Sequence, residues 1–545
     1  MKEEIIEADV LCVGGGPAGL MAAIRASELG AKVVVADKGN TVRSGSAATG
    51  NDHFRCYIPE IHGPDIKPIV EELAQSQAGG MKHISFMRSW LEKSFDIVKL
   101  WDSWGIPMRH QGRYEFAGHA FPGRPIMALK YSGQQQKPIL TREALKRGAI
   151  IVNRTMVFDL LHENGSIVAI GIDTREDKVI VFQTKSVVLG TGVCTRLYPG
   201  PTPGWLFNVA YSPSNTGDGR AMAFRVGAEL ANLELTMRWA GPKYFARCGK
   251  ATWVGVLRDP QGKPVGPFVT KPDKRYGDIA ADVWHTLFED YLKAGKGPVY
   301  MDCSGISDED FEYMMHWMKH EGNAALLDHF DEEGIDIRKN PVEFMTYETI
   351  LAGGVHYNEK GETSVKGLYA AGDELFGGIS CAAVFGWIAG ESAARYSREV
   401  ESFKIEKVRE KISAKKTFLD EIRTREAGAN WQEVNIALQQ VMQDYAGPLR
   451  SETLLEAGLS HLRRLKEKAY STMVAKNQHQ LIHCLEVLNL IELGELVIIT
   501  ANERKETRGR HVRADYPFTN PLLQKMLIVK KIEEGPVTEW REIKR

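Results

Sequence analysis

An apolar run that enters a glycine-rich turn near the start of the chain constrains the fold more than any other feature. Residues 10–19 read Val-Leu-Cys-Val-Gly-Gly-Gly-Pro-Ala-Gly. Gly14 permits the tight turn, Gly16 lets a pyrophosphate approach the backbone, and Gly19 lets the following helix pack close to the sheet. That helix directs its N-terminus at the phosphates. The run therefore predicts a strand, a turn and a helix that together bind a dinucleotide.

A second predicted strand, residues 32–36, ends at Asp37. A carboxylate at this position accepts hydrogen bonds from the adenosine ribose hydroxyls of a bound dinucleotide. An amphipathic helix over residues 17–29 joins the two strands and ends at Gly30, a residue typical of helix C-termini. This context favours a nucleotide site over a glycine turn without ligand, and it leaves NAD and FAD open.

Composition excludes several other classes of protein. The chain has 545 residues, 43% of them hydrophobic, which is enough for two or three domains. Its 69 basic and 70 acidic residues give a formal net charge of -1, so we expect no long-range attraction to nucleic acid or an anionic membrane. The seven cysteines are widely spaced and form no C-x-x-C pair. They predict a reducing compartment and no iron–sulfur cluster or other metal site in this chain.

The first residues and the most apolar late stretch of the chain bear on where the protein is located in the cell. The first residues, Met-Lys-Glu-Glu, lead directly into a predicted strand, without the pattern of a signal peptide. The most apolar late stretch, residues 485–501, contains three glutamates and is too polar to cross a bilayer. We therefore predict a cytoplasmic protein with no direct membrane insertion.

The nucleotide-binding domain is predicted to be discontinuous in the sequence. A buried strand that ends in glycine, residues 186–192, returns the chain to this domain. Residues 235–345 contain mixed turns and helical stretches in place of the pattern that is typical of a parallel sheet, and they are expected to form an inserted cap. Asn430 with Glu433 predicts the start of a later helix. The predicted domains are 1–234 and 352–400 for nucleotide binding, 235–351 for the cap, 401–518 for a helical domain and 519–545 for a tail with a β-hairpin.

Several segments match one known family in the same order along the chain. They are the glycine fingerprint, Leu-Gly-Thr-Gly at 189–192, Asn-Thr-Gly-Asp-Gly at 215–219, the pair Gly353 and Gly354, residues 367–373 and the arginine-rich run 504–517. With these segments the chain resembles the succinate dehydrogenase and fumarate reductase flavoprotein superfamily. The resemblance implies an α/β protein with a Rossmann-like FAD-binding domain, an inserted α+β capping domain and a C-terminal helical domain.

The resemblance also implies the cofactor site. Gly45 stands where succinate dehydrogenases carry the histidine that bonds covalently to flavin, so the FAD is expected to be noncovalent. Three shorter segments, 43–50, 100–107 and 137–139, are most similar to the α (flavoprotein) subunit of dissimilatory adenylylsulfate reductase. The residues expected to bind FAD are Gly14, Gly16, Pro17, Ala18, Gly19, Asp37, Lys38, Ser44, Gly45, Ser46, Thr49, Gly50, Thr191, Gly192, Asn215, Asp218, Gly372, Asp373, Ser380 and Ala382.

Substrate residues of the fumarate-reducing enzymes are replaced at the matching positions. Residues 235–241 stand in place of a His-Pro-Thr loop, Thr349 in place of a histidine, and Gly277 in place of the proton-donating arginine. Glu374 and Leu375 occupy the positions of an Asn-Arg pair. A dicarboxylate needs cationic donors at both ends and a proton source beside the flavin. We therefore expect a small anionic substrate other than fumarate or succinate.

Three residues are candidates for catalysis. His356 has about the position of a flavin-adjacent histidine in adenylylsulfate reductases and could move a proton near neutral pH, although a solvated loop histidine is the alternative. Arg238 has a fork suited to sulfate, phosphate or carboxylate, with a surface ion pair as its alternative. Asn51 follows the predicted flavin loop. His53 could also face the flavin, whereas Lys130 is expected to be a solvated lysine.

Together these features predict the flavoprotein subunit of an FAD-dependent oxidoreductase. Because the chain lacks a second dinucleotide motif for NAD(P)H, we expect electron exchange with a ferredoxin-like iron–sulfur subunit, in a hetero-oligomer. The resemblance implies adenylylsulfate as the small anionic substrate. Two alternatives stay open: a reductase or dehydrogenase of an unsaturated carboxylate, and a subunit that only transfers electrons within a larger complex.

Overall fold

The computed structural model describes residues 1–76, 80–163, 165–202, 204–209, 211–243, 255–266, 271–276, 284–401 and 405–544. Gly277, which replaces the arginine expected from the family, lies outside these residues. No described helix is long and apolar enough to cross a membrane.

A central sheet organises the nucleotide-binding part of the chain. Its strand order is β5-β2-β1-β8-β7-β6, and β15 also pairs with β8. Strands β1, β2, β5, β8 and β15 are parallel, whereas β6 and β7 add to the edge in antiparallel fashion. Apolar runs such as Val-Val-Val-Ala in β2 are buried on both faces, as parallel strands require. The bounds are β1 (Lys2–Val13), β2 (Val33–Asp37), β5 (Ile150–Asn153), β6 (Thr155–Glu163), β7 (Ser166–Asp173), β8 (Lys178–Leu189) and β15 (Leu368–Ala370).

Helices α1 (Pro17–Glu28) and α10 (Gly378–Ser397) pack closely on one another next to this sheet. A Cβ atom on Gly386 would lie 2.3 Å from the backbone oxygen of Ala18. Small residues in α10 therefore bring the two helix axes together. The further elements of this region are β3 (His53–Arg55), α2 (Pro59–His62), α3 (Lys67–Gln75), α4 (Ile84–Trp104), β4 (Ala128–Lys130), α5 (Gln136–Lys146), α6 (Asp218–Arg225), β9 (Leu230–Ala231) and β14 (Gly354–Val355).

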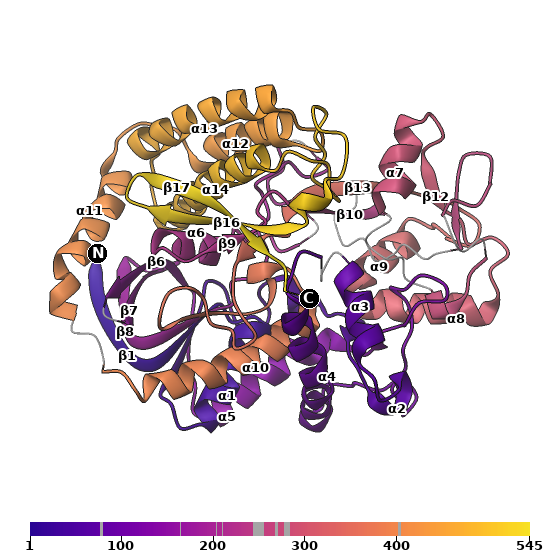
Figure 1. Ribbon diagram of the computed structural model, residues 1–545, viewed down its shortest axis with the longest axis horizontal. Coiled ribbons are helices and arrows are strands. Elements are labelled where there is room, and N and C mark those ends of the chain that lie inside the picture. Colours follow the sequence, from indigo (N-terminus) through magenta and orange to yellow (C-terminus); the bar gives the residue numbers. More distant parts are fainter. Residues whose placement is uncertain are drawn as a thin grey trace.

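An α+β cap stands apart at one end of the molecule, on the right of Figure 1. Its sheet has the order β10-β13-β12-β11, and all three pairings are antiparallel. The cap is inserted between β9 and β14 of the nucleotide-binding part, as the sequence predicts. Its elements are β10 (Thr236–Pro242), β11 (Leu257–Arg258), α7 (Trp284–Lys293), β12 (Val299–Met301), α8 (Asp308–Met318), α9 (Ala324–Glu332) and β13 (Val342–Leu351).

A C-terminal helical layer lies along the top of Figure 1, on the other side of the central sheet from α1 and α10. The expected capping box begins α12, where Asn430 and Glu433 exchange hydrogen bonds. A terminal hairpin then pairs with β9, so that the sheet β14-β9-β16-β17 joins the chain end to the nucleotide-binding part. These elements are α11 (Arg409–Thr424), α12 (Trp431–Ala446), α13 (Glu452–Thr472), α14 (Gln478–Glu503), β16 (Lys525–Ile532) and β17 (Gly535–Glu542). The predicted fold class is confirmed, whereas the finer domain bounds stay predictions.

Candidate active site

A cavity of about 830 Å³ opens where β1, β2 and β8 end. Ligands of open α/β sheets bind at this edge. A Cβ atom on Gly16 would have only the backbone oxygen of Gly190 near it, at 3.8 Å, so the space above the turn is open to a ligand. Most residues predicted to bind the cofactor line the cavity: Gly14, Gly16, Pro17, Ala18, Asp37, Lys38, Ser44, Gly45, Ser46, Thr49, Thr191, Gly192, Asn215, Asp218, Asp373 and Ala382.

Four predicted cofactor residues lie behind the lining: Gly19, Gly50, Gly372 and Ser380. A Cβ atom on Gly19 would lie 1.9 Å from the backbone oxygen of Gly14, so this glycine permits the close approach of α1 to the turn. One on Gly50 would lie 2.8 Å from a backbone oxygen of the cap. The buried hydroxyl of Ser380 accepts from an indole nitrogen at 2.8 Å and donates to a backbone oxygen at 2.5 Å. These residues shape the cavity from outside it.

Asp37 organises the turn through both of its carboxylate oxygens. One oxygen accepts a hydrogen bond from the backbone nitrogen of Gly15 at 2.7 Å. The other accepts from the backbone nitrogen of Gly39 and from the hydroxyl of Ser44, each at 2.8 Å. Asp37 therefore joins the glycine turn to the following loop, and its predicted contact with ribose stays a prediction.

Lys38 connects the cavity to the C-terminal helices. Its Nζ lies 2.8 Å from Asp218 and 2.7 Å from Glu486, which belongs to α14. Burial disfavours the ammonium charge, but these two carboxylates together raise the pKa of Lys38 above its ordinary value. Lys38 thus stays charged beside the cavity, where a cation complements the phosphates of a dinucleotide.

Glu374 is a buried residue of this site that the sequence reasoning did not select. Its Oε1 accepts hydrogen bonds from the backbone nitrogen and the hydroxyl of Thr191, at 2.6 and 2.5 Å. Burial raises the pKa of Glu374, against the opposing effect of Arg220. Arg220 in turn donates to the backbone oxygens of Gly192, Gly353 and Asp373. Glu374 and Arg220 together hold the segment after β8, which contains Thr191 and Gly192, against the segments that contain Gly353 and Asp373. The only signal for this pair in the sequence is a glutamate in place of the family's asparagine.

Two lysines near the cavity are buried. Lys137 lines the cavity and donates to the backbone oxygen of Gly15, and burial lowers its pKa to about 8. Lys130 was expected to be solvated, and that expectation is wrong: the residue is 2% exposed and its Nζ lies 2.5 Å from Asp52. Its burial follows from the pairing of β4 with β3, which places Lys130 directly opposite His53.

A second cavity, of about 1240 Å³, lies against the loop 373–379 of the nucleotide-binding part, which also borders the first cavity. Asp373 and Ile379 line the first cavity, whereas Leu375 and Phe376 between them line the second. The loop is therefore a wall between the two spaces. Among the described residues that line the second cavity, one acidic side chain, Glu71, faces six cationic ones: Lys67, Lys82, Arg88, Arg508, Arg510 and Lys544.

Lys82 fastens this wall from the side of the second cavity. Its Nζ donates to the backbone oxygens of Leu375, at 3.2 Å, and Phe376. The residue is 6% exposed, and burial lowers its pKa to about 8. Lys82 therefore carries a positive charge at neutral pH close to the loop that separates the cavities.

Comparison with known proteins decides the family. The profile described as FAD binding domain matches residues 9–387, and the profile described as fumarate reductase flavoprotein C-term matches residues 435–543. The chain belongs to the succinate dehydrogenase and fumarate reductase flavoprotein family. Its cofactor is FAD, and it is an FAD-dependent oxidoreductase. The open cradle above Gly16 and the cationic Lys38 fit this cofactor.

Individual relatives of this flavoprotein differ in what their names state. One relative belongs to the fumarate reductase (CoM/CoB) of Methanothermobacter marburgensis and is 26% identical, over 97% of this chain and 98% of its own. The L-aspartate oxidase of Yersinia pestis is 25% identical, over 93% and 96%. The structure of adenylylsulfate reductase from Archaeoglobus fulgidus has a TM-score of 0.84 at 21% identity, over 100% and 97%. The last likeness shows the fold alone.

The three predicted catalytic residues of the flavoprotein lie in different places. Asn51 lines the flavin cavity. Arg238, on β10, donates to the hydroxyl of Thr349 on β13 at 3.0 Å, and burial lowers its pKa to about 10. His356 faces Glu229 at 3.5 Å. Neither Arg238 nor His356 is among the described residues that line the two cavities, and all three catalytic roles stay predictions.

The neighbours of His356 indicate a structural contact at the C-terminal hairpin. Arg541 of β17 donates twice to the carboxylate of Glu229, at 2.6 and 2.8 Å. Arg541 and His356 together hold the pKa of Glu229 well below its ordinary range. This cluster joins the chain end to the segment before β9.

Proposed function

We propose that this flavoprotein transfers electrons between an iron–sulfur partner protein and a small anionic substrate, in a reaction related to that of adenylylsulfate reductase. The observation that carries the proposal is the cationic second cavity, which shares the wall 373–379 with the flavin cavity. Arginine and lysine side chains bind sulfate, phosphate and carboxylate through charge-assisted hydrogen bonds. A substrate anion there would lie next to the cofactor site.

The second candidate is reduction of an unsaturated carboxylate. The Methanothermobacter relative is named a fumarate reductase, which favours this candidate, and a carboxylate also suits the cationic lining of the second cavity. Against fumarate itself stand Thr349 and Leu375, which replace the family's substrate histidine and arginine. We therefore place adenylylsulfate first and an enoate other than fumarate second.

One anaerobic experiment separates these substrates. The flavin is reduced with dithionite, excess reductant is removed, and reoxidation is followed by absorbance after addition of adenylylsulfate, fumarate or other enoates. Fast reoxidation by adenylylsulfate alone supports the first proposal, and a response to an enoate alone supports the second. If none of these compounds reoxidises the flavin, the result favours the alternative of a subunit that only transfers electrons.

A matched pair of variants tests the place of the anion. Arg510→Ala removes a cation from the second cavity, whereas Arg463→Ala removes one from the surface of α13, where it pairs with Glu495. We expect KM for the accepted anion to rise at least tenfold in Arg510→Ala and to stay unchanged in Arg463→Ala. Equal KM values in both variants would place the substrate elsewhere.

The proposal of an iron–sulfur partner rests on the absence of a second dinucleotide motif for NAD(P)H from the sequence. We expect the flavin to be reduced by a reduced ferredoxin-like protein and not by NADH or NADPH, in stopped-flow mixing without oxygen. Fast reduction by a nicotinamide cofactor would remove the reason for the partner. The predicted hetero-oligomer and cytoplasmic location are tested by copurification and by fractionation of the cells that make the protein.

A further inference from the structure

A segment that follows β8 has an unusual composition. Residues 197–217 contain no Asp, Glu, Lys, Arg or His, although 26% of the whole chain is charged. Within this run Trp205 is 70% exposed and Phe207 is 50% exposed. Exposed groups of large apolar side chains mark interaction sites, and the centres of protein interfaces are rich in aromatic residues and poor in charge. Residues 197–217, here called the aromatic loop, therefore have the composition of a docking surface.

Hydrogen bonds fix the exposed tip of the aromatic loop. The backbone nitrogen of Trp205 donates to the oxygen of Thr202, and that of Asn208 donates to the oxygen of Trp205, each at 3.1 Å. The side-chain amide of Asn208 also donates to the hydroxyl of Thr202, at 2.8 Å. A Cβ atom on Gly200 would lie 2.2 Å from the backbone oxygen of Asn208, so a glycine is needed where the chain folds back on itself. A surface that is ordered in this way loses little conformational entropy when a partner binds.

A stack of side chains supports the aromatic loop at Phe207. The ring centroid of Phe207 lies 5.8 Å from that of Trp431 on α12, which in turn lies 4.2 Å from that of His483 on α14. The guanidinium group of Arg196 lies over the rings of Phe207 and Trp431, at 5.5 and 5.4 Å. Arg196 is itself buried and pairs with Glu486. The aromatic loop therefore rests on a rigid base formed by the C-terminal helices.

The inner side of the aromatic loop is a wall of the flavin cavity. The described residues of the loop that line this cavity are Phe207, Asn208, Val209 and residues 211–215. The hydroxyl of Ser46, another lining residue, accepts hydrogen bonds from the backbone of Ser212 at 3.4 Å and from the side chain of Asn215 at 3.3 Å. Trp205 is not among the described lining residues, so its exposed ring faces solvent outside the cavity. A protein that covers Trp205 would therefore lie against the outer side of this wall.

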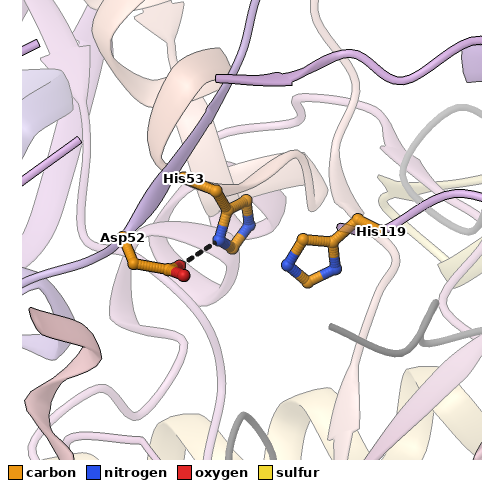
Figure 2. A group of neighbouring side chains, drawn as sticks. All are labelled: Asp52, His53 and His119. Carbon is orange, nitrogen blue, oxygen red and sulfur yellow. Dashed lines mark hydrogen bonds and ion pairs between the residues drawn. The ribbon is translucent and has the colours of Figure 1, made fainter. Parts of the chain in front are cut away.

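The segment 43–53 leads from the aromatic loop to the cap, which covers its other end. Figure 2 shows His53 between Asp52 and His119 in this covered region. The carboxylate of Asp52 lies 2.7 Å from Nδ1 of His53 and 2.5 Å from Nζ of Lys130, and all three residues are buried. A Cβ atom on Gly50 would lie 2.8 Å from a backbone oxygen of the cap. The cap therefore closes this side of the flavin site, whereas the aromatic loop presents Trp205 to solvent.

We propose that the aromatic loop is the docking surface for the iron–sulfur partner, with Trp205 as its main contact. This inference rests on the proposed function, which requires such a partner. Reduction of FAD takes up two electrons and two protons: reduced clusters of the partner supply the electrons, one each, and are oxidised, while solvent supplies the protons. Because the aromatic loop carries no charged side chain, the matching face of the partner is apolar and uncharged.

The test first measures binding, by surface plasmon resonance between the FAD-loaded protein and a purified bacterial ferredoxin that carries four-iron clusters. We expect Trp205→Ser to raise Kd at least about tenfold, because tryptophan dominates many interfaces, and Trp205→Phe to raise it by no more than about threefold. Leu522→Ser is the matched control, because Leu522 is 77% exposed in a different segment, just before β16. This control should retain the wild-type Kd.

Stopped-flow kinetics separate docking from the chemistry of the flavin. At subsaturating concentration, the reduced ferredoxin should reduce the flavin of Trp205→Ser at least about tenfold more slowly than that of the wild type. Reduced methyl viologen needs no protein contact and should reduce both at the same rate, which also shows that the variant is folded and holds FAD. For the wild type, the ferredoxin rate should change by less than about threefold between about 50 and 500 mM salt, because salt has little charge steering to screen.

Three results would overturn the docking surface while the proposed partner stands. The first is a wild-type Kd and rate in Trp205→Ser. The second is a rate that falls about tenfold or more over the same range of salt, which indicates a charged docking surface. The third is a wild-type dimer that Trp205→Ser converts to a monomer in size-exclusion chromatography, which assigns the loop to a second copy of this chain. A wild type that neither binds the ferredoxin nor is reduced by it contradicts the proposed function, and this inference with it.

Discussion

Gly16 and Gly19 lie three residues apart at the start of α1, and their surroundings differ. A Cβ atom on Gly19 would lie 1.9 Å from the backbone oxygen of Gly14, whereas one on Gly16 would approach only the backbone oxygen of Gly190, at 3.8 Å. Gly16 also has φ -77, which any residue adopts. Gly16 therefore leaves space for the cofactor, and Gly19 permits the packing of the helix against the turn.

We expect replacement of Gly19 to lower mainly the stability of the apoprotein, and replacement of Gly16 to weaken mainly FAD binding. Gly19→Ala should destabilise the apoprotein by about 3 kcal/mol, because the methyl group overlaps backbone atoms. Gly16→Ala should cost the apoprotein about 1 kcal/mol or less and weaken FAD binding at least tenfold, because its methyl group enters the cavity. Urea unfolding of the apoproteins and FAD titration followed by flavin fluorescence measure the two effects. Equal apoprotein stabilities would contradict this assignment.

Lys82 illustrates how burial makes a single lysine titrate within an accessible pH range. In the folded protein its pKa is about 8, against an ordinary value of 10.5. Between these two pH values the unfolded chain binds the proton and the folded chain does not. The free energy of unfolding therefore rises with pH across this window through Lys82, and the contribution is smallest below pH 8.

Replacement of Lys82 by methionine should remove that dependence. We expect the stability of the wild type relative to Lys82→Met to increase steadily from about pH 8 to about pH 10.5, measured by urea unfolding at several pH values. Lys99→Met, on the exposed face of the same helix α4, is the control and should follow the wild type. A difference that does not vary with pH would show that Lys82 is not the buried cation described here.

At the scale of elements, α14 is the helix that joins the C-terminal layer to the flavin site. Glu486 in its first half is 1% exposed and lies within 3.0 Å of Lys38, Arg196 and His483. Burial would raise the pKa of Glu486, but these three partners hold it well below its ordinary range. The carboxylate therefore stabilises the folded protein above its ordinary pKa of 4.5 and loses that effect as the pH falls.

Loss of this charge should destabilise the protein strongly at neutral pH. We expect Glu486→Gln to cost about 3–5 kcal/mol, because Arg196 and Lys38 lose a buried partner, and to weaken FAD binding through Lys38. Glu495→Gln, on the same helix, breaks pairs with Arg463 and Lys466 at the surface of α13 and should cost about 1 kcal/mol or less. Guanidinium unfolding measures both costs, and the Glu486→Gln deficit should shrink below pH 4.5.

At the scale of the whole molecule, FAD joins parts of the chain that lie far apart in sequence. The lining of its cavity extends from Val13 through Asn215 to Ala382. A ligand that binds only the folded state stabilises it by about 2.7 kcal/mol at a free concentration of one hundred times its Kd. The thermal midpoint of the protein should therefore rise with FAD concentration.

The mode of FAD attachment can be tested directly. Gly45 lines the cavity and has no side chain that could bond to the flavin. We expect acid precipitation to leave all the flavin in the supernatant, where its absorbance and mass match free FAD. Flavin that remains in the washed protein pellet would contradict noncovalent binding.

The sequence predicts best those features whose cause is local. The glycine turn and the capping box at Asn430 are confirmed, because each depends on the conformational limits of a few neighbouring residues. The family and its cofactor are likewise confirmed from ordered motifs. Lys130 was assigned wrongly because its exposure depends on a strand partner 77 positions earlier in the chain.

The sequence by itself thus determined the fold class, the family and the cofactor of this protein. Only the tertiary structure decided which polar groups meet: Lys38 with Glu486, Thr191 with Glu374, and Asp52 with Lys130. The reason is physical. A glycine or a helix cap acts through its own backbone, whereas the charge and proton affinity of a lysine or carboxylate depend on burial and on partners that folding brings from distant positions.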